Sequence, residues 1–214
     1  SNINEFQSKY NIRFCEENFT LGEKACFASH VVLWEYCVSN NLKYIVIFED
    51  DVLLSTDSRL YLNNLKWIPE GIDVIKIDKF EKSVTMSFKS INIKPMAKLR
   101  ILQQYHMGTA GYILSFNGAR KLLDQVKNTK QSKHIDQLIF NENIYNNFMT
   151  VYQMLPALTI QTDIYGLKNL PSQIQIEREN RQPSKLGMLK IKSSKNILIK
   201  IKKELLRVIK RTKK

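Results

Sequence analysis

Apolar residues recur at helical spacing between Thr20 and Val38, and this segment predicts the first long helix of the chain. Thr20 followed by Glu23 is the capping-box pattern, in which each side chain bonds the other's backbone N–H at a helix start. One face of the predicted helix collects Ala25, Cys26, Ser29, Val32, Leu33 and Tyr36. We expect the helix to end near Asn40.

Uninterrupted apolar runs predict strands. Five apolar residues, Tyr44 to Phe48, follow the first helix without polar alternation, which is typical of a central strand covered on both faces. The run from Ile72 to Ile77 has the same character and ends at Asp78. Residues 109–115 predict a third strand, and weaker patterns predict peripheral strands at 84–93 and 99–105 and extended segments at 151–160.

Two further helices are predicted at residues 116–126 and 134–145. Helices that alternate with buried strands are typical of an α/β domain with a mainly parallel sheet. The chain contains no internal repeat and neither of the glycine-rich phosphate-binding fingerprints. We therefore expect one α/β domain over residues 1–184.

Composition narrows the class of protein. The chain has 214 residues, 43% hydrophobic and 25% charged, which excludes wholesale disorder and suits one domain with an appendage. No apolar run reaches the roughly 18 residues that span a bilayer, and the N-terminal residues lack a signal-peptide pattern.

Three cysteines, Cys15, Cys26 and Cys37, are too few and too widely spaced for a disulfide framework or a zinc site. Reduced thiols in a cytoplasmic protein are the simplest interpretation.

The positive charge is concentrated at one end of the chain. Residues 185–214 hold twelve lysines or arginines against Glu204 alone, a net +11 of the formal +13. Apolar residues recur at helical spacing among these cations, which predicts a basic amphipathic helix. Such a helix can bind an anionic membrane surface, dock on its own domain or contact RNA. The tail has no aromatic residues for base stacking, so we expect no nucleic-acid partner.

Glu49, Asp50 and Asp51 follow the apolar run at 44–48, where a strand of an α/β sheet would open onto a ligand crevice. Adjacent carboxylates repel one another unless a cation neutralises them. Mg²⁺ and Mn²⁺ prefer oxygen ligands and typically combine one or two carboxylates with the oxygens of a diphosphate. The triplet therefore suggests a metal-bridged nucleotide site, although acidic residues also finish strands as solvated turns.

Further motifs accompany the acidic triplet. Residues 21–54 contain the pattern GE-x-x-C-x-x-SH followed by EDDV, and they resemble the family 25 glycosyltransferases of bacterial lipooligosaccharide synthesis. Residues 106–113 are similar to the family's GTAGY strand, 134–136 to its P/H-x-D segment, and 153–158 to its P-A-L strand. The resemblance covers roughly residues 20–165.

The resemblance implies a GT-A-like, Rossmann-type domain that uses Mn²⁺ or Mg²⁺ and a UDP-sugar. Asp51 is then the best candidate for a direct metal ligand, with Glu49 and Asp50 ordering the metal shell or contacting the nucleotide. Family members commonly transfer galactose, with inversion, to an oligosaccharide growing on lipid A. This implies a peripheral enzyme on the cytoplasmic face of the inner membrane, where the basic tail would hold it.

The reaction class requires a base for the acceptor hydroxyl, and Asp136 is our candidate. Its alternative role is to stabilise the first turn of a helix. His134 could join the metal shell or simply cap the same helix. His106 and Thr109 flank Gly108, which predicts either a sugar-contacting loop or a plain turn.

Two expectations concern residues outside these motifs. His30 has no acid nearby in sequence, so we expect a hydrogen-bonded core histidine. Residues 1–19 are polar and match no first strand of the family type, so we expect the N-terminal βα unit to be missing. A non-catalytic relative that only binds sugar or nucleotide, and a basic-tailed adaptor with a structural acidic triplet, are the alternatives to an enzyme.

Overall fold

The computed structural model describes residues 3–15, 18–129 and 133–166. The chain divides into two compact units, residues 1–180 and 181–214, and every described residue lies in the first. The predicted amphipathic helix at 185–214 lies outside the described residues and stays a prediction. In the part described, no helix is both long and apolar enough to cross a bilayer.

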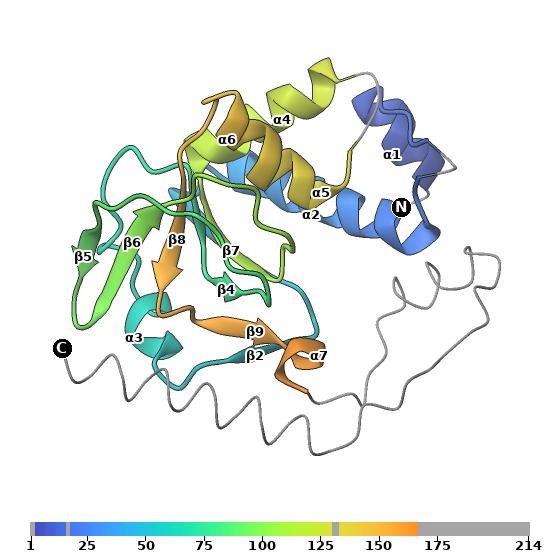
Figure 1. The fold of residues 1–214 in the computed structure, drawn as a ribbon. Coiled ribbons are helices and arrows are strands. Elements are labelled where there is room, and N and C mark those ends of the chain that lie inside the picture. Colours follow the sequence, from blue (N-terminus) through green and yellow to red (C-terminus); the bar gives the residue numbers. More distant parts are fainter. Residues whose placement is uncertain (1–2, 16–17, 130–132, 167–214) are drawn as a thin grey trace, which may run out of the picture. The chain divides into compact units, whose positions relative to one another are not determined.

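A six-stranded sheet forms the centre of the first unit (Figure 1). Its order is β1 (Tyr44–Phe48), β7 (Gly111–Ser115), β3 (Val74–Lys76), β8 (Val151–Leu155), β6 (Ala97–Ile101) and β5 (Ile91–Ile93). Among these neighbours β3 and β8 pair in parallel, and the other pairs are antiparallel. The predicted mainly parallel sheet is therefore wrong, because β7 and β6 run between strands of the opposite direction. An apolar run indicates burial but carries no information about direction.

The run at 44–48 does form β1, but its predicted central position is wrong. Among the described strands β1 lies at one edge of the sheet, and of its residues Ile47 alone is fully buried. Helix α2 (Leu21–Ser39) packs on this edge strand. Both faces of β1 are nevertheless covered, because Ile45 and Ile47 contact one hydrophobic core and the other three residues, Tyr44, Val46 and Phe48, contact the second.

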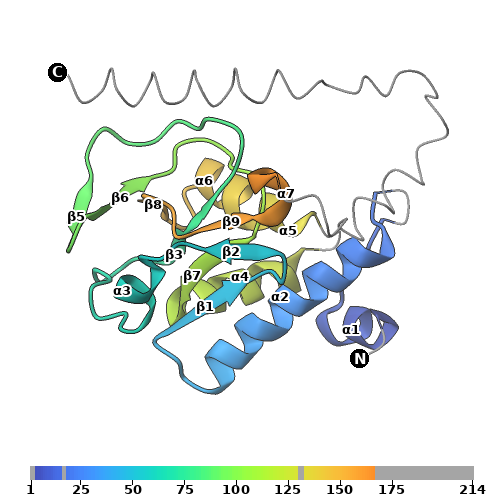
Figure 2. The same cartoon turned by 90° about the horizontal axis from the view of Figure 1, so that it is seen from below.

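A second, three-stranded sheet continues from the first (Figure 2). β2 (Val52–Leu54) pairs antiparallel with β9 (Thr159–Gln161), which pairs in parallel with β4 (Asp78–Lys79). The chain passes from β1 to β2 through residues 49–51, and from β3 to β4 through Ile77. The acidic triplet therefore lies at the junction of the two sheets.

Helices cover both faces of the large sheet (Figure 1). One hydrophobic core joins β7 and β3 to α1 (Ile3–Tyr10), α2, α4 (Phe116–Asn128) and the helical segment 135–145. The second core packs the opposite sheet face against Tyr61 of α3 (Ser58–Leu62). A short helix, α7 (Thr162–Tyr165), follows β9.

Local side-chain bonds explain where the helices begin. The capping box is confirmed, since Thr20 Oγ1 accepts from Glu23 N at 3.1 Å and Glu23 Oε2 accepts from Thr20 N at 2.7 Å. The predicted helix at 134–145 is confirmed as α5 (Ile135–Gln137), a π-helical turn at Leu138–Glu142 and α6 (Asn143–Tyr145). The side-chain amide of Asn143 donates to the carbonyls of Leu138 and Ile139, which stabilises that wide turn.

Candidate active site

The acidic triplet is fixed where β1 ends beside the start of β7. Glu49 N donates to Ala110 O at 3.1 Å, which extends the β1–β7 pairing by one residue. This register places Thr109 against the triplet, and Thr109 Oγ1 donates to Glu49 Oε1 at 2.6 Å. A hydrogen bond thus joins Glu49 to the loop at 106–109, a contact that the sequence did not predict.

Gln161 connects two of the three carboxylates. Its Nε2 donates to Glu49 Oε2 at 3.0 Å and lies 3.4 and 3.3 Å from the two carboxylate oxygens of Asp51. The backbone of Asp51 is also held, because its carbonyl accepts from Thr162 N at 2.9 Å. Asp50 is exposed to solvent. Sequence reasoning missed Gln161, which lies 110 residues away along the chain from Asp51.

Glu49 is the carboxylate of the triplet whose surroundings disfavour its negative charge. Burial raises the pKa of the Glu49 carboxyl, and the negative charges of Asp51 and Asp78 raise it further against the opposing hydrogen bond from Thr109. Among the described residues, the Gln161 amide is the side-chain donor to both oxygens of Asp51, at 3.4 and 3.3 Å. This carboxylate therefore keeps lone pairs for a metal ion. An all-oxygen donor set of this kind fits Mn²⁺ or Mg²⁺.

A buried ion pair lies beneath the site. Lys76 Nζ donates to Asp78 Oδ2 at 2.8 Å and to Gly108 O at 2.6 Å, and it lies 4.5 Å from the centre of the Phe140 ring. Burial lowers the pKa of Lys76 and raises that of Asp78. Sequence reasoning missed this pair, although a lysine inside the apolar run IDVIKI was a usable signal.

Asp136 holds the loop that carries Thr109. Its Oδ2 accepts from Gly108 N at 3.2 Å and from the hydroxyl of Tyr105 at 2.8 Å. Gly108 has a φ of +80°, which suits a glycine, and both of its backbone polar groups are bonded, to Asp136 and to Lys76. The predicted candidate base therefore anchors the loop, and its role as a base stays a prediction.

His106 and His134, which the sequence suggested as site residues, have different surroundings. His106 is buried with its ring edge-on to Phe80, and burial followed by the charge of Lys76 lowers its pKa to about 4. His134 stacks on Phe19, with ring centroids 4.7 Å apart, and its Nδ1 lies 3.6 Å from Glu23 Oε1. These contacts place His134 at the start of α2, and its role as a metal ligand stays a prediction.

The prediction for His30 is confirmed. His30 is buried, and its Nδ1 lies 2.7 Å from the Tyr112 hydroxyl, which also accepts from Trp34 Nε1 at 2.9 Å. Burial lowers the pKa of His30 to about 4, so its ring is neutral near pH 7.

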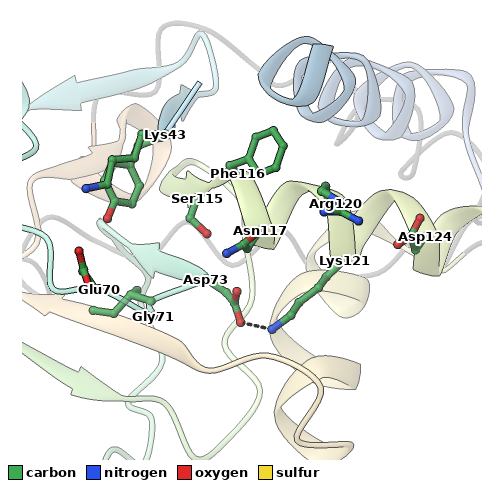
Figure 3. A pocket seen from close by; sticks show the side chains of 12 residues that line it. Lys43, Glu70, Gly71, Asp73, Ser115, Phe116, Asn117, Arg120, Lys121 and Asp124 are labelled. Carbon is green, nitrogen blue, oxygen red and sulfur yellow. Dashed lines mark hydrogen bonds and ion pairs between the residues drawn. The ribbon is translucent and has the colours of Figure 1, made fainter. Parts of the chain in front are cut away.

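A large cavity lies at the other end of the same strands. It measures about 680 Å³ and opens between the residues before β1 and β3 and the start of α4 (Figure 3). Its charges are mixed, and Lys121 Nζ pairs with Asp73 Oδ2 at 2.7 Å inside it. Its lining includes none of the predicted site residues.

Comparison with known proteins decides the family. A family model described as glycosyltransferase family 25 (LPS biosynthesis protein) matches residues 1–139, which include the acidic triplet, the Gly108 loop and Asp136. The chain belongs to glycosyltransferase family 25. The expected family membership is thereby confirmed.

Two similar proteins are named for lipooligosaccharide and lacto-N-neotetraose biosynthesis. The chain is 34% identical over 203 residues to the lipooligosaccharide biosynthesis protein lex-1 of Haemophilus influenzae, covering 91% of this chain and 66% of lex-1. It is 36% identical over 147 residues to the lacto-N-neotetraose biosynthesis glycosyltransferase LgtE of Neisseria gonorrhoeae, covering 65% of this chain and 52% of LgtE. The chain thus spans between half and two thirds of the length of these two relatives.

Proposed function

We propose that this chain is a metal-dependent glycosyltransferase that moves a hexose, galactose, from a UDP-sugar to a lipooligosaccharide acceptor with inversion. The observation that carries the proposal is the pairing of Glu49 and Asp51 through Gln161 at the sheet junction of a family 25 chain. The names of lex-1 and LgtE support the acceptor class. The nucleotide-binding arrangement would be of the GT-A type.

Each residue of the carboxylate site would have a role that follows from its chemistry. Asp51 would ligate Mn²⁺ or Mg²⁺ directly, while Glu49 and Asp50 would order its surroundings. When bound, the cation neutralises the negative charge that develops on the departing diphosphate. Thr109 and Gln161 hold Glu49 from opposite sides, so the carboxylates are oriented before the donor binds. The loop anchored by Asp136 keeps Thr109 in that position.

The direct test is incubation of the full chain with UDP-galactose, Mn²⁺ and a truncated lipooligosaccharide, followed by mass spectrometry of the acceptor. We expect a gain of one hexose and release of UDP, both abolished by a chelator. UDP-glucose in place of UDP-galactose tests the donor. Stable UDP binding without transfer to any acceptor would support the alternative of a binding module.

Asp136→Asn separates the two roles of this residue. As a base, the carboxylate is required for proton transfer, and its loss lowers kcat by about 10²- to 10⁴-fold. If Asp136 is a loop anchor only, the substituted asparagine keeps one acceptor oxygen for Gly108 N, and we expect a kcat change of less than about tenfold. Steady-state kinetics and thermal unfolding, compared with Asp124→Asn on the exposed face of α4, distinguish the outcomes. An unchanged kcat would contradict the assignment of Asp136 as the base.

The basic tail bears on where the enzyme acts. We propose that residues 185–214 hold the enzyme at an anionic membrane surface, where each cation contributes about 1 kcal/mol. Reversing Lys202, Lys203, Lys210 and Arg211 to glutamate should abolish co-sedimentation with phosphatidylglycerol vesicles at low salt. Equal sedimentation of the variant and the unaltered chain would contradict membrane binding through the tail.

A further inference from the structure

Three potential metal ligands meet between α2 and the end of β1. Cys26 and His30 are four residues apart, so they occupy the same face of α2, the face that packs on the sheet. Glu49 is the residue that follows the end of β1. The Cys26 Sγ, a ring nitrogen of His30 and a carboxylate oxygen of Glu49 all lie within 4.8 Å of one another.

The donor set differs from that of the acidic triplet. A thiolate, an imidazole and a carboxylate are the ligands with which proteins bind Zn²⁺, and three of them leave one position open for water or another ligand. Zinc–ligand bonds of about 2.0–2.3 Å require ligand atoms roughly 3.3–3.8 Å apart, so the side chains must close by about 1 Å. Cys26 is partly exposed, which leaves its side chain room for that adjustment.

Outer contacts already orient two of the three ligands. The Nδ1 of His30 lies 2.7 Å from the Tyr112 hydroxyl, a contact that fixes the orientation of the ring. Glu49 is held through its two oxygens by Thr109 and Gln161. Second partners of this kind fix the orientation of metal ligands in proteins.

We propose that Cys26, His30 and Glu49 form a binding site for a thiophilic divalent cation of the Zn²⁺ type, separate from the site of Mn²⁺ or Mg²⁺ at Asp51. On binding, the Cys26 S–H bond breaks, its proton passes to solvent and a sulfur–metal bond forms. The cysteines alone do not suggest such a site, because two of its ligands are other residue types and one comes from a distant strand. Glu49 belongs to both sites, so a zinc-type ion at this position withdraws it from Asp51.

The test uses the full chain without nucleotide and Co²⁺ as a coloured substitute for Zn²⁺. We expect a thiolate-to-cobalt absorption band that Zn²⁺ displaces. Cys26→Ser should abolish this band and weaken Zn²⁺ binding by about tenfold or more, since the soft ligand is lost. The matched control is Cys15→Ser, which removes a partly exposed thiol elsewhere and should leave both readouts unchanged.

Two more variants test whether the cation binds to the proposed ligands and not at Asp51. His30→Gln should weaken Zn²⁺ binding as Cys26→Ser does, with thermal unfolding as the check that each variant is folded. Asp51→Asn should leave the cobalt band intact, because Asp51 is outside this ligand set; this readout is independent of sugar transfer. A cobalt band that persists in Cys26→Ser, or equal Zn²⁺ affinity in Cys26→Ser and Cys15→Ser, would overturn the proposal.

Discussion

Asp51→Asn is expected to lower kcat/KM for sugar transfer by about 10³-fold, a size typical of removing one group that stabilises developing charge. Asparagine keeps the volume of the side chain and an oxygen for the Gln161 amide, so the local structure should persist. It removes the negative charge that would hold the cation against the diphosphate. The loss should therefore fall on metal-dependent catalysis and leave the fold intact.

Thermal unfolding with and without UDP and Mn²⁺ provides the binding readout for this variant. In the unaltered chain, UDP and Mn²⁺ together at a hundredfold excess over Kd should stabilise the fold by about 2.7 kcal/mol. Asp51→Asn should lose this increment. Asp124→Asn, which removes an exposed carboxylate from α4, should retain it. If Asp51→Asn kept the full increment, the metal would not be bound where we place it.

Lys76→Met is expected to lower the free energy of unfolding by about 3–5 kcal/mol, the usual cost of removing one partner of a buried ion pair. The ammonium group is fully buried and bonds both Asp78 and the carbonyl of Gly108. Without it, the Asp78 carboxylate is buried with no opposite charge. The Gly108 loop also loses one of its two anchors, so activity should fall together with stability.

Denaturant titration of three variants checks this interpretation. Lys79→Met, an exposed lysine on β4, should change stability by less than about 0.5 kcal/mol. Lys76→Met combined with Asp78→Asn should recover part of the loss, since no unpaired charge remains.

The pH dependence of Lys76→Met follows from Asp78. Burial raises the pKa of this carboxyl in the folded chain, and loss of the lysine should raise it further. A pKa above the unfolded value means that the folded state binds the proton more tightly, so stability falls as pH rises through that window. The variant should therefore be least impaired at low pH. A stability loss that does not depend on pH would contradict this account of the pair.

Local signals in the sequence predicted the helical segments at 21–39, 116–128 and 135–145, but not α1, α3 or α7. Thr20 and Glu23 specify the start of α2 through contacts within one turn, and the same is true of Ser115 at the start of α4. Apolar runs such as 44–48 did predict the longer strands, because burial selects them, but the short strands β2 and β4 were missed and only 91–93 of the predicted strand at 84–93 forms one. Strand direction and order were not predictable, since they depend on which distant segment pairs with which edge.

In the candidate site, too, residues in local motifs could be nominated from the sequence, whereas their distant partners could not. Glu49, Asp51 and Thr109 could be nominated from the sequence because each lies in a short contiguous motif, and a hydrogen bond joins Glu49 to Thr109 in the structure. Gln161 could not, because only the return of β9 beside β2 brings its amide to the carboxylates. Lys76 carried a usable signal, but its partner at Gly108 is 32 residues away.

Paramagnetic broadening by Mn²⁺ tests the central claim most directly. In amide spectra of the isotopically labelled full chain with UDP, substoichiometric Mn²⁺ broadens signals from residues close to the ion. We predict that the signals of Glu49, Asp51 and Gln161 are lost first, whereas those of Gly71 and Asn117 at the opposite cavity persist. Broadening centred on that cavity, or no selective broadening at all, would contradict a metal site at the junction of the two sheets.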